Sequence, residues 1–143
     1  MVRKFQKTHL DKVMSIWLDS NINVHSFISK SYWEFAFNFV RSAIPLTETY
    51  VYEEDGEVLG FIGVQDTYIA GMFVDASARS RGVGKKLLDY AKTVKTELNL
   101  KVYLKNERAI SFYKREDFVI ESETTDVNTN EAELVMNWQR KEL

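Results

Sequence analysis

Two glycines lie inside a cluster of positive charge in the segment ARSRGVGKKLLDYAK, residues 78–92. The segment follows a predicted strand and opens a predicted helix, so several backbone N–H groups without partners meet at one point. Gly82 and Gly84 let a ligand approach this backbone without a Cβ in its way, and the helix dipole adds partial positive charge. Arginines and lysines around the glycines add full charges. This combination is typical of a site for phosphate oxygens, although two glycines can also simply open a helix.

The spacing R-x-x-G-x-G at residues 79–84 separates this loop from two better-known nucleotide sites. It does not match the P-loop pattern GxxxxGK[ST], and it does not match the dinucleotide pattern GxGxxG. Residues 79–115 carry eleven Lys/Arg against three Asp/Glu, a surplus of eight positive charges, whereas the remaining residues carry eight against eighteen. This division indicates an anionic partner for one part and a cationic partner for the other, or else ordinary solvated helix faces.

The composition narrows the class of protein. A chain of 143 residues predicts one domain, spanning 1–143, with room for a substantial core. There is no cysteine, which excludes disulfides, thiolate metal sites and a cysteine nucleophile. The two histidines, His9 and His25, share no ligand spacing, so we expect no metal. No apolar run reaches the ~18 residues of a membrane span, and the first residues lack the apolar region of a signal peptide, so we expect a cytoplasmic protein with no membrane contact.

The elements that must position these residues form an α+β pattern. Asp55-Gly56 predicts a hairpin, and the segment 68–104 predicts two parallel strands joined by a right-handed crossover. Thr8 is the predicted cap of the first helix, and Pro45 follows the end of the second. The second helix has a predicted apolar side made of Tyr32, Phe35, Ala36, Phe39 and Val40. Helices are predicted over 8–18, 31–44, 82–98 and 106–116, an irregular segment over 19–31, and strands over 2–5, 49–54, 57–65, 68–75, 100–105, 118–122 and 132–140.

Three motifs in order resemble the GNAT superfamily of acetyl-coenzyme A-dependent N-acetyltransferases, from Val2 to about Trp138. They are MFVDASARSRGVGKKLLDYA, then LKVYLKNERAISFYKREDF, then the closing strand. The stretch IWLDSNINVHSFISKSYW also resembles a bacterial subgroup of small GNAT enzymes, some of which acetylate lysines of proteins. The resemblance implies the GNAT fold: a mixed, mostly antiparallel sheet of about seven strands with a parallel, splayed central pair, and about four helices. It also implies transfer of acetyl from acetyl-CoA to a primary amine, with protein lysine or an N-terminus ahead of a small molecule.

The resemblance also implies which residues bind the coenzyme. It assigns the pyrophosphate to the loop amides and the Arg79 side chain, and the pantetheine arm to the strand before the loop, where Gly71 suits a bulge. The strand residues assigned to the coenzyme are Met72, Phe73 and Val74: the backbone of Met72 and Val74 would pair with the pantetheine amides, and the Phe73 side chain would lie in the core. The Val74 N–H would also meet the oxyanion. The loop amides so assigned are those of Arg81, Gly82, Val83, Gly84 and Lys85.

Asn106 and Tyr113 take the remaining family roles. Asn106 would hydrogen-bond the pantetheine arm, although an asparagine here is equally a helix N-cap. Tyr113 lies seven residues on, hence on the same side of the helix, and would protonate the leaving thiolate; it is otherwise a core aromatic, like Phe112. The family usually shows Y-x-x-x-G-F, whereas this chain has Asp117 in place of the glycine. Aspartate tolerates the left-handed conformation moderately well, so we expect local strain without loss of function.

Fewer residues can be assigned to the acceptor site from the sequence. His25, followed by Tyr32 and Trp33, falls in the segment that covers the acceptor cleft in this family, so all three are assigned to the substrate side. His25 is a base, a substrate contact or a plain surface histidine. Acids near strand ends are the other candidates for the base: Glu53, Glu54, Asp66 and Asp75. Glu53 and Glu54 also suit a hairpin surface. The acidic surplus outside residues 79–115 favours a cationic amine acceptor.

Two other functions compete with catalysis. A GNAT-like fold can hold an acyl-CoA as a sensor without transferring the acyl group. A nucleic-acid binder could use the basic stretch 79–115, but its aromatic residues lie on core-like positions instead of forming a stacking surface, so we expect no nucleic acid. For the enzyme we expect a monomer or a homodimer.

Overall fold

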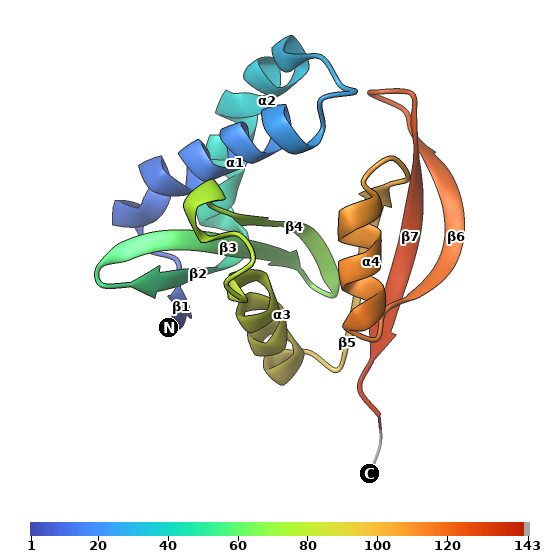
Figure 1. Cartoon of the computed structure of the whole chain (residues 1–143). Helices are drawn as coiled ribbons and strands as arrows, with labels where there is room; N and C mark the ends of the chain where they lie inside the picture. Colours follow the sequence, from blue (N-terminus) through green and yellow to red (C-terminus); the bar gives the residue numbers. More distant parts are fainter. Residues whose placement is uncertain (142–143) are drawn as a thin grey trace.

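The computed structural model describes residues 1–141, and within them seven strands and four α-helices alternate in an α+β arrangement (Figure 1). Three short 3-10 helices, Lys7–His9, Ile44–Leu46 and Ala76–Ala78, connect some of them. No helix among these residues is long and apolar enough to cross a membrane. The elements are β1 (Val2–Lys4), α1 (Leu10–Val24), α2 (Lys30–Ala43), β2 (Glu48–Glu54), β3 (Glu57–Gln65), β4 (Tyr68–Val74), α3 (Val83–Val94), β5 (Glu97–Tyr103), α4 (Glu107–Arg115), β6 (Val119–Asp126) and β7 (Glu131–Gln139).

The strands form one sheet in the order β1-β2-β3-β4-β5-β7-β6. Every neighbouring pair is antiparallel except β4 and β5, which are parallel and joined by the crossover through α3. These two strands pair at a single position, Tyr68 with Asn99, and then diverge. The predicted mixed sheet with a splayed central pair is therefore confirmed, and the divergence leaves a gap between two strands in the middle of the sheet.

Strand β4 presents unpaired backbone groups to this gap. The Asp75 N–H donates to the Leu59 carbonyl of β3 at 2.8 Å. Backbone groups alternate in direction along a strand, so Phe73 also bonds to β3, whereas the amides of Met72 and Val74 point toward β5. In the register with β3, Ala70 is an extra residue, since Gly63 pairs with Gly71 and Val64 with Ile69. The bulge expected beside Gly71 is present, and it bends β4 next to the gap.

The helices cover the two faces of the sheet in pairs (Figure 1). Side chains of α1 and α2 form one core with Val51, Val58 and Phe61 of the sheet. Side chains of α3 and α4 form the other, with Ile62 and Leu100 among the strand residues. Phe73 and Tyr103 contact the first core, and Met72 and Val102 the second, as expected from the alternation along β4 and β5.

Three helix boundaries differ from the predictions. Thr8 does not cap the first helix: the 3-10 turn Lys7–His9 comes first, Gln6 and His9 exchange the capping hydrogen bonds, and α1 begins at Leu10. That helix runs on to Val24, so the first half of the segment 19–31 is helical and not irregular. Helix α3 ends at Val94 and not at Leu98, because Leu98 starts the buried alternation Leu98, Leu100, Val102 of β5.

The apolar side predicted for the second helix is wrong in part. Trp33 is buried, and Tyr32, Ala36 and Val40 pack against the first core, but Phe35 and Phe39 are 88% and 78% exposed. The helix presents a different face to α1 because Trp33 and Phe37, which the prediction left out, pack on Trp17 with ring centroids 5.9 and 6.4 Å apart. At the end of α4, Asp117 has a φ of 71°, the left-handed conformation expected there.

Candidate active site

The loop between β4 and α3 has the open conformation that the two glycines predicted. Gly82 is the N-cap of α3 with a φ of 78°, and a Cβ built on it would meet nothing within 4 Å. No side chain among residues 1–141 caps this helix. The amides of Val83, Gly84 and Lys85 occupy its first turn, where N–H groups have no partner within the helix.

A cavity of about 420 Å³, here called the loop cavity, lies between this loop, β4 and α4. Arg79, Ser80 and Lys85 line it from the loop side, and Arg108 and Arg115 line it from α4. The Lys85 ammonium is also paired with Glu116 at 2.9 Å and with Asp89, one helical turn further on, at 3.4 Å. Among the described residues, this lining holds four cations and no carboxylate, and it includes a helix N-terminus, so it is strongly electropositive.

Arg81 is separate from this cavity. Its backbone N–H donates to the Ala78 carbonyl at 3.3 Å, and its guanidinium pairs with Glu54 at 3.0 Å. Of the loop residues predicted to hold a pyrophosphate, Arg79 and residues 82–85 line the loop cavity and Arg81 does not.

A second cavity, of about 300 Å³ and here called the gap cavity, passes between the diverging strands β4 and β5. Phe73 and Tyr103 line it on the side of α1 and α2, and Met72 and Val102 on the side of α3 and α4. It therefore extends through the sheet. His25 and Trp33 from the predicted substrate side line it, whereas Tyr32 lies outside it and packs on Trp33.

The two cavities meet at residues that line both, among them Met72, Asn106 and Tyr113. Tyr113 is 8% exposed, and its ring packs between those of Phe112 and Phe118. Its hydroxyl makes no hydrogen bond with any residue in 1–141. Burial raises the pKa of the Tyr113 phenol, so it keeps its proton at neutral pH. Phe112, predicted as a core aromatic, packs on the core and also lines the loop cavity.

Asn106 is the N-cap of α4, as one of its two interpretations requires, and its amide nitrogen lies at the site. Its Oδ1 accepts from the Ala109 N–H at 3.2 Å, which caps α4, while its Nδ2 lies 3.3 Å from Nε2 of His25 at the wall of both cavities. The other ring nitrogen of His25 lies 2.9 Å from Oδ1 of Asn21. His25 is therefore bound at both nitrogens and is not a plain surface histidine.

Two carboxylates, from Asp126 of β6 and Glu133 of β7, line the gap cavity. Tyr103 donates a hydrogen bond of 2.7 Å to Asp126. Burial opposes ionisation of Asp126, but this bond and one from the Asn128 amide hold the pKa of Asp126 below its usual value. Glu133 faces Tyr103 across the strand pair, is 9% exposed, and has no hydrogen bond or ion pair in the described chain. Burial, then the charge of Asp126, raises the pKa of Glu133.

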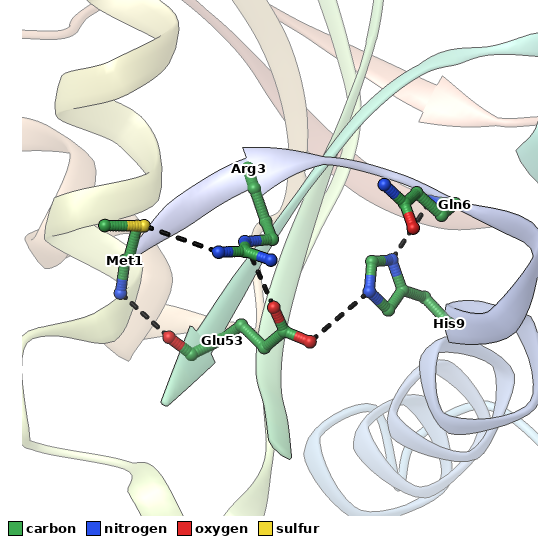
Figure 2. Close-up of polar contacts among 5 residues, drawn as sticks. All are labelled: Met1, Arg3, Gln6, His9 and Glu53. Atoms are coloured by element: carbon green, nitrogen blue, oxygen red, sulfur yellow. Dashed lines mark hydrogen bonds and ion pairs between the residues drawn. The ribbon is translucent and has the colours of Figure 1, made fainter. Parts of the chain in front are cut away.

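The acids proposed from sequence as the base line neither cavity. Glu53 of β2 is paired with Arg3 of the edge strand β1 at 3.1 Å, and its carboxylate lies 3.5 Å from Nε2 of the buried His9 (Figure 2). Glu54 pairs with Arg81, and Asp75 caps the turn after β4 while pairing with Lys12 at 3.5 Å. Asp66 lies in the β3–β4 turn with a φ of 56°. The hairpin-surface interpretation of Glu53 and Glu54 fits these contacts.

Sequence reasoning missed several residues that line the cavities. Arg108 and Arg115 fall in the basic stretch 79–115, and their seven-residue spacing along α4 was the available signal for the loop cavity. Glu133 alternates with Leu134 on β7, which indicates a different face of the sheet but not a cavity there. Asp126 ends β6 without any local signal.

Three comparisons with known proteins agree. Residues 45–120 match the model of the acetyltransferase (GNAT) domain. The chain is 35% identical over 140 residues, 96% of each chain, to the peptidyl-lysine N-acetyltransferase YiaC of Escherichia coli (strain K12). The solution structure of apo-form YjaB from Escherichia coli superimposes with a TM-score of 0.86 at 25% identity, over 99% of this chain and 98% of YjaB. YncA from Salmonella typhimurium, solved with its cofactor acetyl-CoA, shares the fold with a TM-score of 0.71 at 15% identity, over 100% of this chain and 95% of YncA. The chain therefore belongs to the GNAT family and is an acetyltransferase.

Proposed function

We propose that this enzyme transfers acetyl from acetyl-CoA to the side-chain amine of a lysine presented by a protein or peptide. One observation carries the proposal: a basic cavity at a helix N-terminus and a cavity with two carboxylates meet at Tyr113. The names of YiaC and YjaB, both peptidyl-lysine N-acetyltransferases, support the same acceptor.

The loop cavity suits a coenzyme with several phosphates. The amides of residues 82–85 would hold the pyrophosphate, because the unpaired N–H groups and the helix dipole favour an anion there. Arg79, Arg108 and Arg115 supply charges that are always on and can bind phosphate with two hydrogen bonds each. The outward amides of Met72 and Val74 offer the pantetheine arm the pairing that a neighbouring strand would otherwise give.

The gap cavity suits a cationic amine on an aliphatic stem. Its walls carry the rings of Trp33, Phe73 and Tyr103, which can pack on methylene groups. Asp126 and Glu133 supply the carboxylates that attract an ammonium group. Both residues belong to the acidic surplus outside residues 79–115, which was expected to favour a cationic acceptor.

The chemistry needs a neutral amine, a stabilised oxyanion and a protonated leaving group. A lysine amine has a pKa of ~10.4, so about one in a thousand is neutral at pH 7.4, a deficit of ~4 kcal/mol. Glu133 would accept the proton, since it is buried, unpaired and less acidic than usual. The Val74 N–H would donate to the carbonyl oxygen as charge develops. As the carbon–nitrogen bond forms and the carbon–sulfur bond breaks, Tyr113 would give its proton to the sulfur. Burial raises the pKa of the Tyr113 phenol, and it would raise the pKa of the leaving thiol in the same way, so that proton transfer between them stays favourable.

An acceptor screen that follows thiol release from acetyl-CoA tests the proposal. One peptide carries a single lysine and a blocked N-terminus, and its control carries a free N-terminus and a blocked lysine. We expect kcat/KM to be at least about tenfold higher for the first, because a lysine side chain can reach through the gap cavity. Preference for the second peptide, or for small acidic amines, would contradict the proposed acceptor.

Two substitutions that each remove a negative charge test whether the acceptor binds in the gap cavity. Asp126→Asn and Glu133→Gln should each lower kcat/KM for the lysine peptide by about tenfold or more. Coenzyme A binding, measured by calorimetry, should not change, because neither residue lines the loop cavity. If these substitutions weakened coenzyme A binding by the same factor as kcat/KM, the carboxylates would belong to the coenzyme site and not to the acceptor site.

A further inference from the structure

His25 joins two elements that lie on different sides of the sheet. It follows the last turn of α1, while its ring partner Asn106 caps α4. The contacts form one chain: Asn21 Nδ2 donates to the Trp17 carbonyl at 2.9 Å, Asn21 Oδ1 lies 2.9 Å from His25 Nδ1, and His25 Nε2 lies 3.3 Å from Asn106 Nδ2. Asn106 Oδ1 closes it by accepting from the Ala109 N–H.

The backbone groups at the two ends determine every proton between them. The Trp17 carbonyl only accepts, so the Asn21 amide turns its nitrogen there and its oxygen toward His25. The Ala109 N–H only donates, so the Asn106 amide turns its oxygen there and its nitrogen toward His25. His25 must then donate from Nδ1 and accept at Nε2, which is the neutral imidazole with its lone pair facing Asn106.

The surroundings of the ring favour the same neutral form. Phe27, Trp33 and Tyr103 pack around it with centroids 5.0 to 5.7 Å away. Burial lowers the pKa of His25 to about 4. A protonated ring would also set a second N–H against the Asn106 amide, in place of the hydrogen bond.

Asn106 has one more donor than this chain of hydrogen bonds uses. Its Nδ2 carries two hydrogens, of which His25 takes one. Since Asn106 lines both cavities at their junction with Tyr113, the second can reach a ligand there. We propose that His25 is a positioning residue: by accepting from Asn106 it fixes that amide so that the remaining N–H meets the pantetheine arm of acetyl-CoA. This role rests on the proposed use of acetyl-CoA.

Three substitutions at one position separate this role from packing. His25→Phe keeps an aromatic ring but removes both hydrogen bonds. His25→Gln can put an acceptor near the position of Nε2, and His25→Asn can bond Asn21 but not reach Asn106. We expect Phe and Asn to raise the KM for acetyl-CoA and the Kd for coenzyme A by about two- to tenfold, the effect of one lost hydrogen bond. In the Gln variant, the KM for acetyl-CoA and the Kd for coenzyme A should both stay within about twofold of the wild-type values. In every variant, the KM for the lysine peptide should change less than the KM for acetyl-CoA.

A double-mutant cycle tests whether His25 acts through Asn106. Asn106→Ser keeps an N-cap but removes the amide N–H groups. If the proposal is right, adding His25→Phe to Asn106→Ser weakens coenzyme A binding by less than twofold more, because the two residues share one interaction. Additive losses would overturn the positioning role, and so would rescue by Asn that equals rescue by Gln.

Two controls keep the outcomes separate. Nitrogen NMR of the wild-type imidazole at pH 7 should find the proton on Nδ1 of His25, and a proton on Nε2 would overturn the proposal whether or not any variant folds. If the wild-type protein neither binds coenzyme A nor releases thiol from acetyl-CoA, the proposed function fails together with this role. If the wild type binds and the Phe and Gln variants behave alike, only the positioning role fails.

Discussion

The substitution Tyr113→Phe removes one oxygen atom and tests the chemistry of the site most directly. The hydroxyl has no hydrogen-bond partner within residues 1–141, and the ring keeps its packing between Phe112 and Phe118. Loss of the hydroxyl therefore leaves no protein group unsatisfied. We expect the free energy of unfolding to change by less than about 1 kcal/mol.

The expected kinetic loss is much larger. A positioned general acid typically contributes about 10²–10⁴ in rate. Because the hydroxyl lies in a buried junction where water replaces it poorly, we expect kcat to fall by about 10²–10³, a loss of roughly 2.7–4 kcal/mol at 1.36 kcal/mol per decade. The Kd for coenzyme A should rise by no more than about tenfold, since one neutral contact is worth only ~0.5–1.5 kcal/mol.

The assay is steady-state thiol release with a saturating lysine peptide, beside calorimetric binding of coenzyme A. Tyr90→Phe is the matched control, because Tyr90 packs on Tyr50 and lines neither cavity. An acetyl thioester of a more acidic thiol should shrink the deficit of Tyr113→Phe, since its leaving group needs less protonation. A kcat within threefold of the wild type, or an equal deficit with both thioesters, would refute the assignment of Tyr113 as the acid.

Three further predictions concern binding and stability. Gly84→Leu should weaken coenzyme A binding by more than about tenfold, because the leucine side chain would extend into the loop cavity. The thermal midpoint should change little, because a Cβ at this position would lie 3.5 Å or more from the three nearest side chains. Glu48→Gln should reduce the loss of stability at acid pH, because the hydrogen bond from Lys95 lowers the pKa of Glu48 in the folded protein. The stabilisation by Glu48, below about 1 kcal/mol, is present above the unfolded pKa of ~4.3 and is lost as the pH falls through the lower folded pKa. Urea unfolding of both proteins at pH 7 and pH 3 would measure the difference. Gly60→Ala should cost about 1–3 kcal/mol by chemical denaturation, because its Cβ would lie 2.9 Å from a backbone carbonyl, whereas Gly63→Ala, with its nearest atom 3.7 Å away, should cost little.

The parts of the fold that depend on local pattern could be predicted. The Asp55-Gly56 turn, the crossover through α3 and the bulge near Gly71 each follow from residues adjacent in sequence, and the structure contains all three. The boundaries were predicted less well, because competing signals lie only a few residues apart. Thr8 is a good cap by type, but the exchange between Gln6 and His9 starts the first turn instead.

The predictions of the site depended on how far apart in sequence its parts lie. The loop side of the loop cavity comes from one continuous stretch, so Arg79 and residues 82–85 were predicted, whereas Arg108 and Arg115 of α4 were not. The gap cavity gathers residues from α1, α2, α4 and the four strands β4 to β7, and its acids, Asp126 of β6 and Glu133 of β7, come after the crossover. Nothing local distinguishes Glu133 from a solvent-facing glutamate on an alternating strand. Only the divergence of β4 from β5, a property of the whole sheet, turns that face into the wall of a cavity.

The meeting of the two cavities also bears on how the acetyl group travels. A relay through a covalent enzyme intermediate needs a nucleophile at the junction, and the chain has no cysteine. His25 has its lone pair engaged by Asn106, and Tyr113 keeps its proton because burial raises its pKa. In the proposed arrangement the coenzyme would enter from the side of α3 and α4 and the acceptor from the side of α1 and α2, so neither would displace the other. Both could then be bound at once, and direct attack of the amine on the thioester is the route that this arrangement favours.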